Sequence, residues 1–193
     1  MRVELKTRFL VSLLLACAAT CVVSFPARAA GDEGDRTATI KAAFMYRFIQ
    51  YVRWPEAETG AETEDETKDT DPFVIHILGE SDLEGPLRKV AEKKKVGERD
   101  LVVRSSDTVE SLEPCQMLLL APSKAEQLEQ ILEQLADRKL LTVGDTDGFG
   151  KKGVAINFVL ARGKVRFEIN RKALADADLW VSSHLLKLGI LVE

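Results

Sequence analysis

Apolar residues follow two different patterns along this chain, a helical periodicity and the continuous runs that are typical of buried strands. Between residues 38 and 53 the larger apolar side chains recur every three to four positions: Ile40, Ala43, Phe44, Phe48 and Val52. This spacing predicts an amphipathic helix, which Thr37 or Thr39 would cap and Pro55 would end.

Continuous apolar runs beyond residue 72 predict buried strands at 73–78, 101–104, 117–121 and 140–143. Helical patterns separate them. One helix is expected from Asp82 to about Lys94, and another starts at the capping box formed by Ser123 and Glu126. Two successive β-α-β units with fully apolar strands predict a parallel sheet that helices cover on both faces.

The last third of the chain predicts an antiparallel hairpin, with strands at 154–160 and 164–169. Apolar Val165 and Phe167 alternate with charged side chains in its second strand. Asn170 would cap a short helix to about residue 177, and Ser182 or Ser183 would begin a last one. The predicted fold class is therefore α/β, with a mostly parallel central sheet, a C-terminal antiparallel hairpin and terminal helices.

Residues 1–29 have the pattern of a secretory signal. A basic start precedes the apolar run from Phe9 to Val23, and Ala27 to Ala29 forms an A-x-A cleavage site. The run is shorter than the ~20 residues that a membrane-spanning helix needs, and it stays apolar past Cys17, unlike a lipoprotein signal. We expect cleavage after Ala29, no direct membrane insertion, and a single domain at residues 30–193.

Charge and cysteine content narrow the possible partners. Without residues 1–29 the chain keeps 23 basic and 30 acidic residues, a difference of about −7, which argues against binding nucleic acid or anionic lipid. Eight of the acids lie in the sixteen residues 56–71, a composition that predicts a flexible, solvated loop. Cys115 would be the one remaining cysteine, so no internal disulfide is predicted.

The motifs that suggest catalysis do not satisfy the spacing that catalysis requires. The glycine-rich stretch 144–153 lacks the spacing of a phosphate loop and the ligands of a calcium loop. Ser183 and His184 are sequence neighbours that diverge on a helix, and His76 has no metal-ligand cluster beside it. We predict no catalytic residue, metal or cofactor. The stretch 144–153 is either a strand connection or the lip of a small-ligand site at the sheet's carboxyl edge.

Several fragments, taken in order, resemble the YfiR type of periplasmic regulator, and the resemblance extends over nearly all of residues 38–192. The fragments are Lys41–Phe48, Trp54–Pro55, Val74–Gly79, Val96–Gly97, Pro114–Cys115, Leu141–Asp145, Phe149, Ile156–Phe158, Val165–Asn170 and Ser182–Leu186.

The resemblance implies a periplasmic homodimer that binds the periplasmic part of an inner-membrane diguanylate cyclase of the YfiN type. Such binding would repress the cyclase and lower cyclic di-GMP and biofilm formation. Glu168, Asn170, Ser182 and Ser183 would shape the edge that meets the partner or a ligand. The chain departs from its relatives at His76, where they often carry Cys. The alternative function is a periplasmic receptor for a nucleotide or amino acid, with its ligand near Gly144.

Overall fold

A computed structural model describes residues 30–54 and 71–193. The predicted signal at 1–29 lies outside the described residues. So does the acidic segment 56–71, except for its last residue, Asp71. The chain divides into two compact units, Met1–Asp32 and Glu33–Glu193. The described part of the first unit is the helical stretch 30–32, and the other described residues belong to the second unit.

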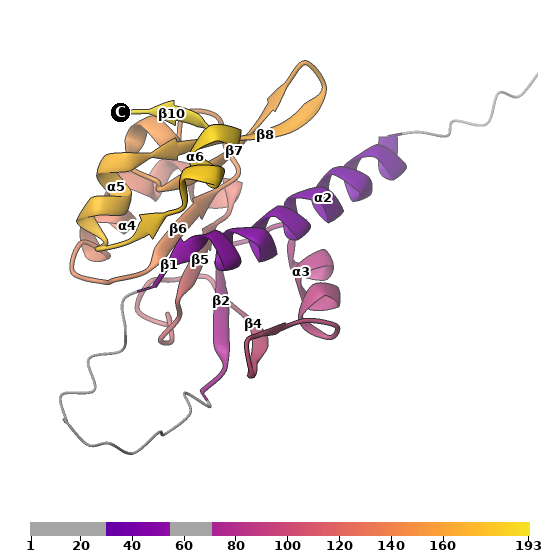
Figure 1. Ribbon diagram of the computed structural model, residues 1–193, viewed down its shortest axis with the longest axis horizontal. Coiled ribbons are helices and arrows are strands. Elements are labelled where there is room, and N and C mark those ends of the chain that lie inside the picture. The colour runs from indigo at the N-terminus through magenta and orange to yellow at the C-terminus, as the bar shows by residue number, and fades with distance from the viewer. Residues whose placement is uncertain (1–29, 55–70) are drawn as a thin grey trace, which may run out of the picture. The chain divides into compact units, whose positions relative to one another are not determined.

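An eight-stranded sheet organises this unit, with the strand order β10-β8-β7-β6-β5-β2-β4-β3 (Figure 1). The strands are β2 (Phe73–Leu78), β3 (Lys95–Val96), β4 (Arg99–Ser106), β5 (Met117–Leu120), β6 (Leu141–Gly144), β7 (Ile156–Ala161), β8 (Lys164–Asn170) and β10 (Ile190–Val192). Strands β4, β2, β5, β6 and β7 are mutually parallel, whereas β8 runs antiparallel to β7. The mostly parallel sheet and the C-terminal antiparallel hairpin are thereby confirmed.

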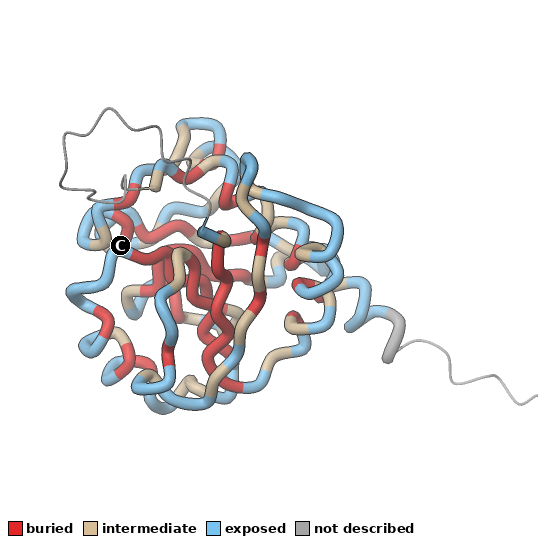
Figure 2. Tube along the Cα trace, turned by 90° about the horizontal axis from the view of Figure 1, so that it is seen from below, coloured by how far each residue is buried: buried red, intermediate tan, exposed pale blue. Residues whose placement is uncertain are grey.

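Helices cover both faces of the sheet. The helices are α2 (Ala30–Tyr51), α3 (Glu84–Ala91), α4 (Leu128–Gln134), α5 (Arg171–Asp176) and α6 (Ser183–Leu188), with short 3-10 turns η1 (Pro122–Gln127) and η2 (Gly150–Lys152). One core joins α2, α3, α5 and α6 to alternate side chains of the strands, such as Ile75 and Leu119. The core on the opposite face joins α4 to Leu118 and Leu120. Buried residues accordingly gather along the central strands in Figure 2.

Helix α2 differs from the predicted helix in its start and its buried face. It begins at Ala30 and passes through Thr37 and Thr39 without a break, so neither threonine is the cap. The buried positions of the helix are Ala38, Ala42, Met45, Phe48 and Ile49, and Val52, directly after its end, is buried as well. Ile40, predicted to face the core, is 40% exposed. The buried face is therefore rotated from the predicted one toward Ala38, Ala42 and Met45.

The predicted capping box at Ser123 is wrong. Pro122–Gln127 forms the 3-10 turn η1, and α4 begins only at Leu128. The Ser123 hydroxyl instead accepts a hydrogen bond from the backbone N–H of Glu80, at 3.0 Å. This hydrogen bond therefore joins the segment after β5 to the segment after β2, and the Ser123 oxygen does not cap a helix.

Four short strands were absent from the sequence prediction. One of them, β3, pairs antiparallel with β4 at the edge of the main sheet. Strand β1 (Val52–Arg53) pairs antiparallel with β9 (Trp180–Val181) to form a separate two-stranded sheet. Strand β10 adds to the main sheet parallel to β8. Each has only two or three residues, which is too short for an apolar period to be detected.

Candidate functional site

The predicted residues Glu168 and Asn170 lie where β6 ends and the loop 145–155 leaves the sheet. Gly144, Asn157 and Glu168 are direct neighbours across strands β6, β7 and β8. The side chains of Asn157 and Glu168 share the face of the sheet that also carries α4, because Phe158 and Phe167 point to the α2 face. We call Asp145, Asn157, Glu168 and Asn170 the loop clamp, since each of them holds the loop or its ends.

Buried Asn157 connects the loop to Glu168. Its side-chain oxygen accepts a hydrogen bond from the Thr146 N–H at 3.4 Å, and its Nδ2 donates to Glu168 Oε2 at 3.1 Å. The half-buried carboxylate of Glu168 also packs against Gly150, where an added Cβ would lie 2.6 Å from Oε2. A residue with a side chain at position 150 would therefore require the Glu168 carboxylate to move.

Asn170 links the same loop to helix α5. Its Nδ2 donates to the carbonyl oxygen of Gly150 at 2.8 Å, and its Oδ1 accepts from the Ala173 N–H at 2.9 Å. The second bond is the predicted N-cap of α5, which is confirmed. The first bond was not predicted, because sequence gives no sign that the loop returns to the end of β8.

An ion pair fixes the beginning of the loop. Lys41 Nζ of α2 lies 2.5 Å from Asp145 Oδ1, and the two side chains are 12% and 9% exposed. Desolvation raises the pKa of the Asp145 carboxyl above its usual value, although the Lys41 ammonium opposes this shift. Sequence reasoning missed this pair. The available signal was an aspartate directly after a buried strand and a lysine beside the buried face of α2.

Ser182 and Ser183 belong to a different place, the start of α6. The Ser182 hydroxyl accepts from the Leu185 N–H at 3.2 Å and caps the helix, while its own N–H donates to the Tyr51 carbonyl at 2.9 Å. Ser183 is exposed. The contacts of these serines are thus with α6 and the end of α2, and they do not join the loop clamp.

His76 and Cys115 both lie in surroundings that suppress ionisation. His76 Nε2 is 2.8 Å from Ser106 Oγ, and its Nδ1 is buried without a hydrogen-bond partner among the described residues. Burial lowers the pKa of His76, and burial raises the pKa of the free Cys115 thiol to about 11. Within residues 30–54 and 71–193, no three His, Cys, Asp or Glu side chains lie close enough to hold a metal.

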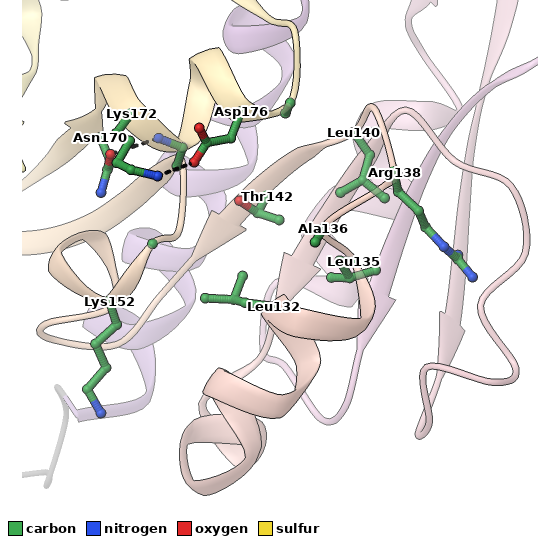
Figure 3. Close-up of a pocket in the computed structure, with 13 residues that line it drawn as sticks. Leu132, Leu135, Ala136, Arg138, Leu140, Thr142, Lys152, Asn170, Lys172 and Asp176 are labelled. Atoms are coloured by element: carbon green, nitrogen blue, oxygen red, sulfur yellow. Dashed lines mark hydrogen bonds and ion pairs between the residues drawn. The ribbon is translucent and has the colours of Figure 1, made fainter.

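A hollow lies beside the clamp, between α4, β6 and α5, with Thr142 and Asn170 among its lining residues (Figure 3). From the sequence, the stretch 144–153 is either a strand connection or the lip of a small-ligand site near Gly144. At Gly144 itself the packing is close, because an added Cβ would lie 2.7 Å from Asn157 Oδ1 and 2.9 Å from the Phe149 ring. Space for a ligand on this face is found at the hollow.

The fold and the clamp define a mostly parallel α/β domain that presents a tightly held loop at the carboxyl end of β6. The chain belongs to the YfiR/HmsC-like family, whose model matches residues 38–190. Membership is consistent with a role as a periplasmic regulator, and the family is regulatory rather than catalytic. The resemblance predicted from sequence fragments is thereby confirmed.

A solved structure has a similar fold. It is a conserved domain protein from Vibrio cholerae O1 biovar eltor str. N16961, with a TM-score of 0.54 and 10% sequence identity. The similarity covers 81% of this chain, and the chain spans 60% of that structure's length. At this identity the likeness shows the fold alone. No curated protein sequence matches the chain.

Proposed function

We propose that this protein is a periplasmic regulator that represses an inner-membrane diguanylate cyclase of the YfiN type by binding it directly. The observation that carries the proposal is the family match over residues 38–190. Repression would follow from linkage: if the regulator binds the inactive cyclase more tightly than the active one, it shifts the population toward the inactive state. Cyclic di-GMP and biofilm formation would then fall.

The loop 145–155 supports a role in protein contact. The clamp holds the loop from inside, and Phe149 and Gly150 are buried, whereas Asp147, Lys151 and Lys152 are exposed. A loop held in one conformation loses little entropy when it meets a partner, which favours binding. Asn170 would therefore act by keeping this surface in shape, whereas Glu168 would in addition present its negative charge to the partner.

Export to the periplasm is part of the proposal. It rests on the signal pattern at residues 1–29 and on the family. No helix among the described residues is long and apolar enough to cross a membrane. A homodimer is likewise proposed from the family resemblance. Sedimentation of the purified protein would test it, and a monomer at micromolar concentration would contradict it.

Deletion of the gene tests repression. We expect cyclic di-GMP and surface attachment to rise in the deletion strain, and the full chain to reverse both changes. A form lacking residues 1–29 should fail to do so, because it would stay in the cytoplasm. An unchanged nucleotide level in a strain with the cyclase intact would contradict repression and favour the receptor alternative.

Two substitutions ask whether the predicted site residues meet the partner. Glu168→Gln keeps an oxygen for Asn157 Nδ2 and removes the negative charge, and Ser183→Tyr changes an exposed position. Each should weaken repression while leaving the thermal midpoint nearly unchanged. Glu126→Gln, an exposed carboxylate on η1, is the matched control. Full repression by both variants would remove Glu168 and Ser183 from the proposed interface.

A further inference from the structure

The hollow between α4 and α5 has a volume of about 450 Å³, within the range of small-molecule sites. Three leucines form its wall on one side, Leu132 and Leu135 near the end of α4 and Leu140 just before β6. Figure 3 shows α5 on the other side, with Lys172 and Asp176, and Thr142 of β6 between the two walls. The wall is suited to an apolar body.

The polar groups of the floor offer hydrogen-bond donors. Thr142 is 8% exposed, and its hydroxyl oxygen accepts from the Ala155 N–H at 2.9 Å, so its own hydrogen remains available for donation. Asn170 is 5% exposed, and its Nδ2 uses one hydrogen on the Gly150 carbonyl. The second amide hydrogen is available as well. Such a floor is suited to a group that accepts hydrogen bonds.

The rim is positively charged although the chain is not. Arg138, Lys152 and Lys172 border the hollow with a single carboxylate, Asp176, which lies 2.6 Å from Lys172 Nζ. The whole chain carries a net charge of −4. A basic opening on an acidic protein concentrates anions near it. In Figure 3, Arg138 and Lys152 extend outward on opposite sides, and rotation about their flexible stems would bring their charges over the opening.

We propose that this hollow binds a small organic carboxylate with an apolar body. The body would pack against the leucine wall, and the carboxylate would accept hydrogen bonds from Thr142 and Asn170 beneath the basic rim. Since Asn170 also holds the Gly150 carbonyl, an occupied hollow would restrain the loop 145–155. The proposal does not depend on repression of a cyclase, and its test measures binding alone.

Titration of the purified protein with phenylacetate tests the proposal, with phenylacetamide as the neutral match. Backbone amide NMR shifts should move at Thr142, Asn170 and Ala173, and phenylacetate should bind at least about fivefold more tightly than the amide. Equal affinities, or shifts confined to other regions, would overturn the proposed carboxylate site.

Two variants locate the site. Lys152→Glu should weaken phenylacetate binding by about fivefold or more, whereas Lys151→Glu, its exposed neighbour outside the lining, should not. Ala136→Trp would fill the hollow from its exposed rim and should abolish binding, with Ala43→Trp on the exposed side of α2 as control. The hollow is excluded if Lys152→Glu and Ala136→Trp bind as well as their controls do.

Discussion

The Asn170 side chain makes two separate hydrogen bonds that stabilise the fold. It caps α5 with its oxygen and holds the Gly150 carbonyl with its nitrogen. Asn170→Ala should therefore lower the free energy of unfolding by roughly 2–4 kcal/mol, the cost of a lost cap together with a buried carbonyl left without a donor. Urea denaturation of the purified variant would measure this loss.

Ser182 and Ser183 provide a comparison for that loss. Ser182 caps α6, and its side chain has no second hydrogen bond to any residue that the structure describes, so Ser182→Ala should cost about 1 kcal/mol. Ser183 is exposed, and Ser183→Ala should change stability by less than about 0.5 kcal/mol. If Asn170→Ala costs no more than Ser182→Ala does, the bond to Gly150 contributes nothing measurable.

Cys115 is expected to be a poor nucleophile. Burial raises the pKa of its thiol from 9.0 to about 11, and only the thiolate reacts with alkylating reagents. At pH 8 the folded protein should react with iodoacetamide about a hundredfold more slowly than the urea-unfolded chain. Equal rates in the two states would show that the thiol is not shielded. Non-reducing gels would reveal any covalent dimer.

Helix α2 holds the unit together through one face. Phe48 is fully buried, and its ring lies 5.7 Å from that of Phe158 and 5.0 Å from that of Phe167. Phe48→Ala should therefore cost about 3–5 kcal/mol. Ile40→Ala, on the exposed side of the same helix, should stay within about 0.5 kcal/mol. Similar losses in thermal or urea unfolding would contradict this orientation of the helix.

Strands were the elements most readily predicted from the sequence. Phe73–Leu78 and Met117–Leu120 are buried along their whole length, so their side chains are apolar throughout, except for His76 in the first strand. The start of α2 was missed because its first turns are polar and mostly exposed and carry no apolar period. The capping box failed because its serine bonds to a neighbouring segment, a tertiary effect that local sequence does not encode.

The candidate site was predictable only in part. Asn170 could be recognised as a cap, because that role depends on residues three positions apart. The contact of Glu168 with Asn157 depends on the register of the predicted hairpin, where the two residues are directly paired. The contact of Lys41 with Asp145 joins a helix to a loop about a hundred residues later, and it depends on how the helix packs on the sheet, which no local pattern specifies.

The pH dependence of stability is a property of the whole molecule. Burial holds the pKa of His76 below its ordinary 6.5 in the folded state, with Glu113 raising it and Arg104 lowering it to a smaller extent. Between the folded and unfolded pKa values the unfolded chain binds more protons, so stability is lost as the pH falls from about 6.5 through the folded pKa. Thermal midpoints measured from pH 8 to 5 would show this decline.

His76→Leu isolates the contribution of this imidazole. Leucine suits the buried position in β2, and Ser106 keeps its donation to the Thr108 carbonyl. The decline below pH 6.5 should become shallower in the variant. The contribution of Asp145 to the pH dependence has the opposite sign, because its raised pKa lowers stability as the pH rises above 3.8. This contribution should be the same in His76→Leu and in the unchanged protein. Identical pH profiles would exclude His76 as the cause.

The aromatic contacts of α2 also constrain the order in which the chain can mature. Phe44 and Phe48 come early in the sequence, and their ring partners Phe158 and Phe167 are more than a hundred residues later. Contacts of such high sequence separation form slowly, because a long loop must close first. A nascent chain would therefore expose this apolar helix face until the C-terminal hairpin has been made. Proteases and chaperones would meet the helix during that interval, and prematurely terminated chains would remain their targets.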